Sequence, residues 1–290
     1  MRWDSKKANQ FEGLTMDVEK FWSTTDLNKF IYQKTKELCE AEGFVASPRR
    51  SKHLVRIGEH HIHIVYPEIW RSRTIIHFGV SPATSFNNHA ILGDAKIYLR
   101  KNNDPDDLFN EYFRLATDIN NPKWSYDSEK MKAVWDEVVV PQLTKEMLSI
   151  LRTFTFEQFM TLCENRKNGI LRYGSNPGID DAPLYMARGH NRIWKGNVKE
   201  SISLLEQAIL GYDQHFIRCK NFGEEILHYV QQEFFSTQKL LSIIKNRDID
   251  IESYVLDYMR KLEEIALNKT WGVMLSSDGK TIRLKKKELL

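Results

Sequence analysis

HLVRIGEHHIHIVY, residues 53–66, is the stretch of this 290-residue chain that decides the fold. Apolar and polar side chains alternate on either side of Gly58-Glu59. Such alternation is typical of strands, and a short glycine-containing break between two alternating runs indicates a β-hairpin. With Gly58-Glu59 as a two-residue loop, Arg56 pairs with His61 in an antiparallel register. The stretch therefore predicts the first two strands of a sheet.

The two faces of this hairpin differ in polarity. Antiparallel sheets commonly bury one face and leave the other in water. The apolar face, expected to be buried, carries Val55, Ile57, Ile62, Ile64 and Tyr66. The other face carries Leu54, Arg56, His61, His63 and Val65. We therefore expect His61 and His63 to point away from the core.

Two later stretches also alternate and predict further strands of an antiparallel meander. They are RTIIHFGV at residues 73–80 and AKIYLR at residues 95–100. In the first of them His77 is expected to face outward, across from His63. The side chains expected to face inward are Ile76, Phe78 and Val80.

Three imidazoles on one sheet face have the geometry of a metal site with three histidine ligands. The candidate ligands are His61, His63 and His77, and the corresponding function is a metal-dependent hydrolase. Two features disfavour this interpretation. Arg56 stands beside His61 and raises the cost of binding a cation, and the only carboxylate in the hairpin is Glu59 in its turn. We therefore expect no metal, no other cofactor and no catalytic residues.

Helical spacing of apolar residues surrounds the predicted strands. Residues 26–42 are expected to form a helix that is capped by Thr25 and ends at Gly43. A second helix is expected to begin at Pro105 and to carry Phe113 on its apolar face.

The chain beyond Asp127 is predicted to be mostly helical. Pro141 is expected to kink or end the first of these helices, and Thr155 with Gln158 forms a capping box at the start of another. Gly189 is expected at a tight helix crossing, in a segment that resembles a single tetratricopeptide-type pair. The remaining helices are predicted near residues 183–194, 198–213, 223–246 and 250–269.

The end of the chain returns to strand character. Asp278-Gly279 stands between two alternating runs and is the strongest short hairpin signal in the sequence. A two-residue loop there sets Leu275 opposite Ile282 and Val273 opposite Leu284. Because a two-stranded hairpin is marginal alone, we expect it to pack on the sheet, on the last helices or on a second copy.

These elements predict an α+β protein with an antiparallel sheet and flanking helices, followed by a mostly helical C-terminal region and a terminal β-hairpin. We place an α+β domain at residues 1–168 and the helical region with its hairpin at residues 169–290. The second region is expected to pack on the first, because its helices are too few and too amphipathic to close a core of their own.

Composition narrows the classes of function. The 42 basic and 39 acidic residues give a net charge of +3, which is too small to indicate nucleic acid or an anionic membrane as a partner. The sequence contains neither an apolar run long enough to span a membrane nor an apolar segment typical of a secretory signal. Cys39, Cys163 and Cys219 are far apart, which is typical of reduced thiols. We therefore expect a cytoplasmic protein.

Common catalytic motifs are absent from the sequence, including the Walker A motif, the nucleophile elbow and the H-E-x-x-H zinc motif. Asp180-Asp181 is a carboxylate pair that is expected to favour the start of the next helix. Cationic and aromatic residues around the first hairpin are the candidate binding residues, as contacts to a protein or to nucleic acid. They are Arg49, Arg50, Arg56, Trp70, Arg71 and Arg73, with Lys52 added in the nucleic-acid alternative.

KFIYQKTKELCEAEGF (residues 29–44), the paired strands that follow and RTIIHFGVSP (residues 73–82) resemble a family of bacterial domains of unknown function. That family shares the order of helix, Gly-Phe motif, meander and a strand ending in Gly-Val. WDEVVVPQLTKEML (residues 135–148) is similar to its proline-containing helix. The resemblance covers about residues 25–165. It implies a small α+β domain, associated in some members with immunity or defence, and implies no catalytic residues.

The leading hypothesis is a non-enzymatic bacterial protein that binds another protein, as an immunity or defence-associated factor. One alternative is the metal-dependent hydrolase described above. Another is a weak nucleic-acid binder that uses the basic surface of the first hairpin. The identity of the partner and the oligomeric state stay open at this point.

Overall fold

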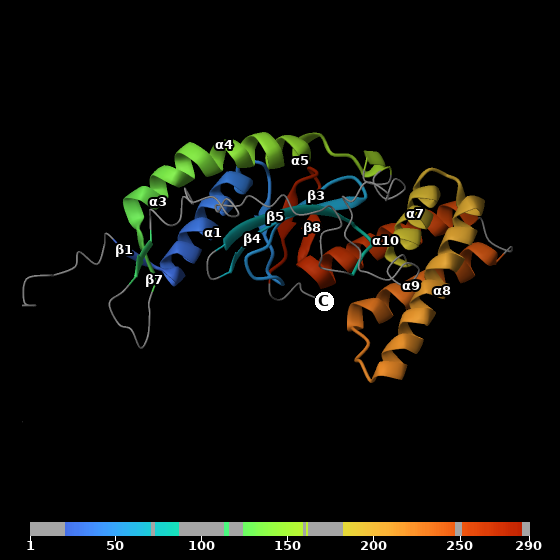
Figure 1. The fold of residues 1–290 in the computed structure, drawn as a ribbon. Helices are drawn as coiled ribbons and strands as arrows, with labels where there is room; N and C mark the ends of the chain where they lie inside the picture. Colours follow the sequence, from blue (N-terminus) through green and yellow to red (C-terminus); the bar gives the residue numbers. More distant parts are fainter. Residues whose placement is uncertain are drawn as a thin grey trace, which may run out of the picture.

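The computed structural model shows an α+β fold in which a four-stranded antiparallel sheet lies among helices and a two-stranded hairpin ends the chain (Figure 1). This confirms the predicted fold class. The structure describes residues 21–70, 73–86, 113–115, 124–158, 161, 182–246 and 251–285. The strand expected at 95–100 and the carboxylate pair Asp180-Asp181 lie outside these residues.

The central sheet has the strand order β2-β3-β4-β5. Its strands are β2 (Val45–Ala46), β3 (Leu54–Ile57), β4 (His61–Trp70) and β5 (Arg73–Pro82). The predicted pairing of Arg56 with His61 is wrong, because Arg56 pairs with His63. The turn is longer than two residues: the N–H of Gly58 donates to the carbonyl of His61 at 2.8 Å, and His60 adopts a positive φ of 58°. A shift of two residues leaves every side chain on its predicted face of the hairpin.

Helices cover both faces of this sheet, so the prediction of one solvated face is wrong. On the first face, Leu54, Val65, Ile76, Phe78 and Val80 pack against residues of the first helix and of a long helical segment near residues 131–151. On the second face, Val55, Ile57, Ile62 and Ile64 pack against Leu267, Trp271 and Val273. His61 and His63 belong to the first face and are only 3% and 4% exposed.

The two faces of β5, the third strand of the predicted meander, are reversed relative to the prediction. Val80 pairs with His63, and His77 pairs with Tyr66. Residues that pair across an antiparallel ladder share a face. The apolar side chains of β5 therefore lie with the histidines of β4, and His77 lies on the opposite face.

Helix α1 (Thr24–Glu40) begins with a capping box. Ser23 is the N-cap instead of the predicted Thr25, and its hydroxyl and N–H both interact with Asp26. Gly43 follows the helix with a φ of 82°, a left-handed conformation that glycine adopts without strain. The apolar side chains Leu27 and Ile31 of α1 are buried against the first sheet face.

A long helical segment arches over α1 and the sheet (Figure 1). It consists of α3 (Ser128–Val134), η2 (Trp135–Val139), α4 (Val140–Gln142), η3 (Leu143–Leu148) and α5 (Ser149–Thr153), where η2 and η3 are π-helical. Pro141 was predicted to kink or end a helix, but the chain stays helical through it. Pro141 cannot donate to the preceding turn, and π-helical turns lie on both sides of it.

A four-residue repeat explains why this segment is wider than an α-helix. An α-helix turns by about 100° per residue, so a four-residue spacing drifts by about 40° at each step. Wider π turns remove that drift and keep the repeat on one face. The buried side chains that follow this repeat are Met131, Trp135, Val139, Leu143, Met147 and Leu151.

A second, small sheet has the order β1-β7-β6. Its strands are β1 (Phe21–Ser23), β6 (Phe113–Leu115) and β7 (Trp124–Asp127). The helix predicted from Pro105 is therefore wrong at Phe113, which is in a strand and pairs with Tyr126. The rest of that prediction lies outside the described residues.

The C-terminal region contains four helices among the described residues. They are α7 (Ala182–Trp194), α8 (Val198–Phe222), α9 (His228–Lys245) and α10 (Ile251–Trp271). Gly189 lies at a close crossing of α7 and α8, because a Cβ there would stand 2.7 Å from Leu205. The capping box of Thr155 and Gln158 is also present, with hydrogen bonds of 2.9 and 3.2 Å.

The first hairpin contacts this helical region through His60. Its ring stacks on Trp194 of α7 at 3.8 Å between centroids, and its Nδ1 lies 3.0 Å from a carboxylate oxygen of Glu263 in α10. Just after β5 in the sequence, the buried residues Thr84 and Ser85 form side-chain hydrogen bonds to α7 and α9, respectively. The sheet and the helices thus share a continuous packed boundary.

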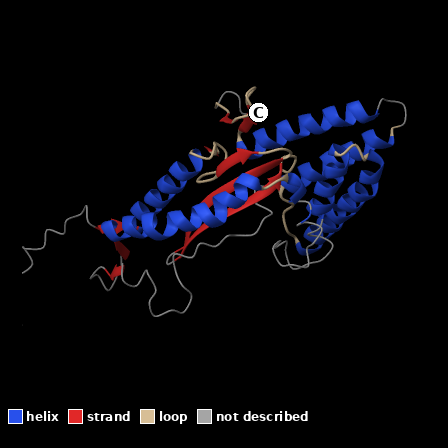
Figure 2. Cartoon of the chain, turned by 90° about the horizontal axis from the view of Figure 1, so that it is seen from above, coloured by secondary structure: helices blue, strands red, loops and turns tan. Residues whose placement is uncertain are grey.

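The terminal hairpin consists of β8 (Val273–Leu275) and β9 (Thr281–Arg283) and lies beyond the end of α10 when seen from above (Figure 2). The predicted register is wrong by one residue, because Met274 pairs with Ile282 and Leu275 with Thr281. Met274 and Ile282 are exposed on the outer side, whereas Val273 is buried. The hairpin docks on the first sheet through a 2.8 Å hydrogen bond from the N–H of Ile57 to the hydroxyl of Thr281.

Candidate functional site

The polar side chains of the first sheet face form a chain of hydrogen bonds. The guanidinium of Arg56 donates to Nδ1 of His63, at 3.3 Å from Nε and 3.0 Å from Nη2. Nε2 of His63 lies 3.0 Å from Nε2 of His61. Nδ1 of His61 lies 2.6 Å from the carbonyl oxygen of Glu59. These hydrogen bonds thus run in series from the Arg56 guanidinium through the two imidazoles to the main-chain carbonyl of Glu59.

These contacts determine the tautomers of both histidines. A guanidinium only donates, so Nδ1 of His63 accepts and its proton is on Nε2. That proton is donated to Nε2 of His61, whose own proton is therefore on Nδ1 and is donated to Glu59. Both rings are neutral, and each ring nitrogen has a partner. No lone pair of His61 or His63 is left for a metal ion.

Burial agrees with the neutral state of the two rings. Burial in the sheet, followed by electrostatic repulsion between a protonated ring and the neighbouring His61 and Arg56, lowers the pKa of His63 to about 2. Burial also lowers the pKa of His61. A protonated imidazole here would lack water and stand beside a guanidinium.

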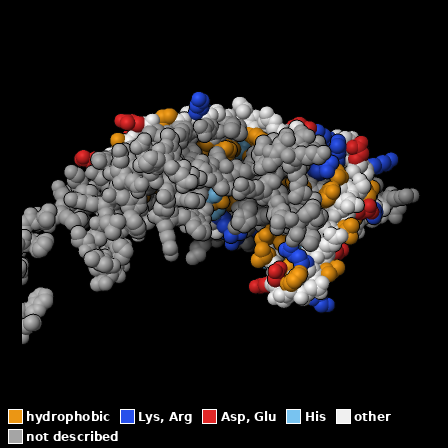
Figure 3. Space-filling model, viewed as in Figure 1, with side chains coloured by type: hydrophobic (Ala, Val, Ile, Leu, Met, Phe, Trp, Pro, Cys, Tyr) orange, Lys and Arg blue, Asp and Glu red, His pale blue; other side chains and the backbone are white. Residues whose placement is uncertain are grey.

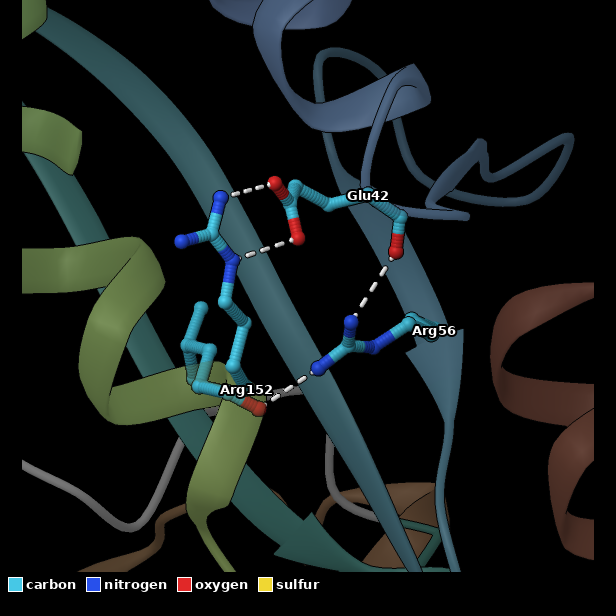
Figure 4. A network of polar contacts seen from close by, with 4 residues as sticks. Glu42, Arg56 and Arg152 are labelled. Carbon is cyan, nitrogen blue, oxygen red and sulfur yellow. Dashed lines mark hydrogen bonds and ion pairs between the residues drawn. The ribbon is translucent and has the colours of Figure 1, made fainter.

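Arg56 is an internal connector between two helix ends and the sheet (Figure 4). Its Nη1 donates to the carbonyl of Glu42 at 2.9 Å, and its Nη2 donates to the carbonyl of Leu151 at 2.5 Å. The two carbonyls follow α1 and lie in the last turn of α5, where the negative ends of helix dipoles favour a cation. The carboxylate of Glu42 also binds Arg152, and these hydrogen bonds hold the pKa of Glu42 below its usual value.

Gly58 makes room for the ring of His61. A Cβ at position 58 would stand 2.4 Å from Nε2 of His61. The glycine of the turn is therefore required by the packed imidazole.

The three-histidine site of the alternative interpretation does not form, because His77 lies on the other sheet face from His61 and His63. There its ring stacks on Tyr66 at 4.5 Å between centroids, and Tyr66 stacks in turn on His53 at 4.5 Å. Within the part of the chain that the structure describes, no group of three histidine, cysteine or acidic side chains could hold a metal ion.

The predicted basic surface is only partly present among the described residues. Arg49 is exposed and Arg50 is partly buried, but Arg56 points into the protein instead of toward solvent. Trp70 and Arg73 pair at the end of the β4–β5 ladder, and Arg71 lies outside the described residues. The contribution of Arg56 to a solvent-facing patch was therefore wrongly predicted.

A buried carboxylate, Glu233 of α9, was not identified from the sequence. It accepts hydrogen bonds from the hydroxyl of Ser85 at 2.5 Å, from the N–H of Phe86 at 3.1 Å and from the hydroxyl of Tyr212 at 2.9 Å. Nearby in the chain, Thr84 bonds to the fully buried His190, whose pKa is lowered by burial to about 3. These groups attach the segment after β5 to the helical region.

Large apolar side chains are exposed along α8 and α9, which the helical pattern alone did not reveal. Figure 3 shows hydrophobic side chains gathered over the lower ends of these helices. Leu210 is 50% exposed, and Ile217 and Phe235 are each 61% exposed. Phe222 and Leu227, beside the connection of the two helices, are 75% and 52% exposed.

The register of α8 and α9 places three of these side chains on one side. The helices form an antiparallel pair, in which Lys245 reaches Glu206 at 2.7 Å and the rings of Phe216 and Phe234 lie 4.9 Å apart. Each next residue of a helix is rotated by about 100°. Phe216 and Phe234 face each other across the pair. Because the helices run in opposite directions, the next residue on each helix turns toward the same side of the pair. Ile217 and Phe235 therefore lie on one side.

Leu210 precedes Ile217 by two helical turns and shares its stripe. We call Leu210, Ile217 and Phe235 the α8–α9 apolar surface. Large exposed apolar residues that adjoin one another mark binding surfaces more often than isolated ones do.

No protein-family model, curated protein or solved structure matches this chain. Among the helices of the described residues, none combines the length and the apolar character needed to cross a lipid bilayer.

Proposed function

We propose that this chain is a non-enzymatic bacterial protein that binds another protein, in the immunity or defence-associated class that its sequence suggests, and that it acts in the cytoplasm. The α8–α9 apolar surface carries the proposal. Ile217 and Phe235 are each 61% exposed on the same side of a packed pair of helices. Buried aromatic and aliphatic anchors supply most of the affinity in protein interfaces.

The polar groups of the sheet support a structural role for that region. Arg56, His61 and His63 bond to one another and to main-chain carbonyls that hold the helices in place. The cysteines support a reducing compartment. Cys39 and Cys219 are free and buried, and burial raises the pKa of Cys39 to about 12.

The test is affinity capture from the native host with a matched pair of variants. The double variant Ile217→Ser/Phe235→Ser removes the apolar surface, and Ile282→Ser removes an exposed apolar side chain from the distant hairpin. We expect the wild-type and Ile282→Ser chains to retain the same partner, and the double variant to lose it. With purified partner, the double variant should raise Kd by at least about tenfold.

Equal binding by the wild type and the double variant, with both folded by circular dichroism, would overturn this assignment of the surface. Loss of the partner in Ile282→Ser alone would move the interface to the terminal hairpin.

A further inference from the structure

Two opposite charges border the α8–α9 apolar surface. Asp213, Ile217 and Lys220 are spaced four and three residues apart, so they lie on one stripe of α8. Asp213 and Lys220 are exposed, and neither forms an ion pair within the part of the chain that the structure describes. By contrast, Glu206 on the same helix pairs with Lys245. The exposed stripe therefore holds an acid and a base without partners, with an apolar side chain between them.

We propose that the partner on this surface is a second copy of the chain, with α8 packed antiparallel against α8 across a two-fold axis. The proposal rests on the proposed function, because it names the protein that the surface binds. A two-fold interface joins the same patch of both copies. With the axis level with Ile217, Asp213 of each copy lies against Lys220 of the other, and two ion pairs form.

The apolar residues meet at the same axis. Phe234 packs on Phe216, so Phe235 on α9 is level with Ile217 on α8. Ile217 and Phe235 of both copies then form an apolar centre, and the Asp213–Lys220 pairs lie around it, as in an interface with an apolar core and a polar rim. An unrelated partner would need a matching acid and base at this spacing, whereas a second copy supplies them by symmetry.

The size of the face suits this arrangement. Helix α9 has 18 residues. At about 1.5 Å per residue it is about 27 Å long, and two adjacent helices are about 20 Å wide. Such a corrugated face approaches the roughly 800 Å² of accessible surface per partner that specific interfaces bury.

Charge reversal tests the proposal in the full-length chain. Sedimentation equilibrium of the wild type should show a dimer. In either single variant, Asp213→Lys or Lys220→Asp, both ion pairs between the two copies become pairs of like charge. The dimer dissociation constant should therefore rise by about tenfold or more. The double variant Asp213→Lys/Lys220→Asp should restore it to within about threefold of the wild type. An equimolar mixture of the two single variants should form heterodimers for the same reason.

Lys261→Asp, an exposed charge reversal on α10, is the control and should leave the dimer unchanged. A wild-type monomer at all concentrations overturns the second copy as partner. The proposed function still stands in that case if Ile217→Ser/Phe235→Ser abolishes capture of another protein. A dimer that is unaffected by either single reversal places the self-association elsewhere and also overturns the proposal. Rescue by mixing shows that the single variants are folded.

Discussion

The N–H of Ile57, in the second strand of the central sheet, donates to the hydroxyl of Thr281, in the last strand of the described chain, at 2.8 Å. The hydroxyl of Ser47 likewise donates to the carbonyl of Trp271 at 2.7 Å. The terminal hairpin and the end of α10 are therefore attached to strand β3 and to the segment that follows β2 by side-chain to main-chain bonds. Trp271 and Val273 fill the core between them.

Replacing Thr281 by Val should weaken this attachment. Valine has nearly the same shape but cannot accept a hydrogen bond, so the buried N–H of Ile57 would be left without its partner. We expect the free energy of unfolding to fall by about 1–3 kcal/mol, measured by urea denaturation. Ser277→Ala, in the exposed turn of the same hairpin, is the control. Equal denaturation midpoints for Thr281→Val and the wild type would show that the hairpin contributes nothing through this bond.

Arg56→Lys should destabilise the protein although it conserves the charge. Arg56 reaches His63, Glu42 and Leu151 at once, and a lysine ammonium cannot span all three. We expect a loss of about 2–4 kcal/mol in the free energy of unfolding. The matched control is Arg49→Lys, because Arg49 is exposed. If both variants unfold alike, Arg56 is not the connector that its contacts indicate.

Acid should unfold the protein through its neutral histidines. The pKa of His63 is lowered to about 2 and that of His190 to about 3, below the usual 6.5. Below pH 6.5 the unfolded chain therefore binds more protons than the folded one, and stability falls as the pH falls. Below about pH 5.5 these two groups together lower the free energy of unfolding by roughly 3 kcal/mol for each unit that the pH falls.

The measurement is the denaturation midpoint between pH 7 and pH 4. His190→Asn removes one of the titrating groups, so its stability should depend less steeply on pH than that of the wild type. His228→Gln, at an exposed position, is the control. A wild-type midpoint that stays constant down to pH 4 contradicts the neutral buried rings.

Chelation of metal should leave the protein unchanged. Every nitrogen of His61 and His63 is used within the protein, and His77 is on the other face. Untagged protein should contain well under one equivalent of transition metal per chain, and its Tm should be the same with and without a chelator. Stoichiometric zinc, manganese or iron that is lost in His61→Ala would show that the hydrogen-bonded arrangement gives way to a metal site.

Gly189→Ala should be costly despite the small change. The added Cβ would stand 2.7 Å from Leu205, which is fully buried between α7 and α8. We expect overpacking to lower the free energy of unfolding by about 1–3 kcal/mol. In the double variant Gly189→Ala/Leu205→Ala the clash is absent, so its loss should be smaller than the sum of the two single losses. Additive losses would show that the cost of Gly189→Ala does not come from its contact with Leu205.

The sequence by itself determined the two strands of the first hairpin, the side chains that share each of its faces, and the helical character of the C-terminal region. Alternation in residues 53–66 indicated strands, and an error of two residues in the turn left the faces unchanged because strands have a period of two. The four-residue repeat from Met131 to Leu151 was also present in the sequence, although its consequence, a widened helix through Pro141, was not predicted.

Tertiary structure decided which faces are buried and which side chains meet. His61 and His63 resembled solvent-facing residues because nothing local indicates that the rings of Phe44, Phe154 and Phe156 pack against them. His77 was assigned to the wrong face because the register of β4 and β5 depends on a long hairpin whose pairing is set by both packed faces. The exposed side chains of α8 and α9 had the spacing of core residues. Burial depends on neighbours that are distant in the chain, and a local pattern records only that a side chain is apolar.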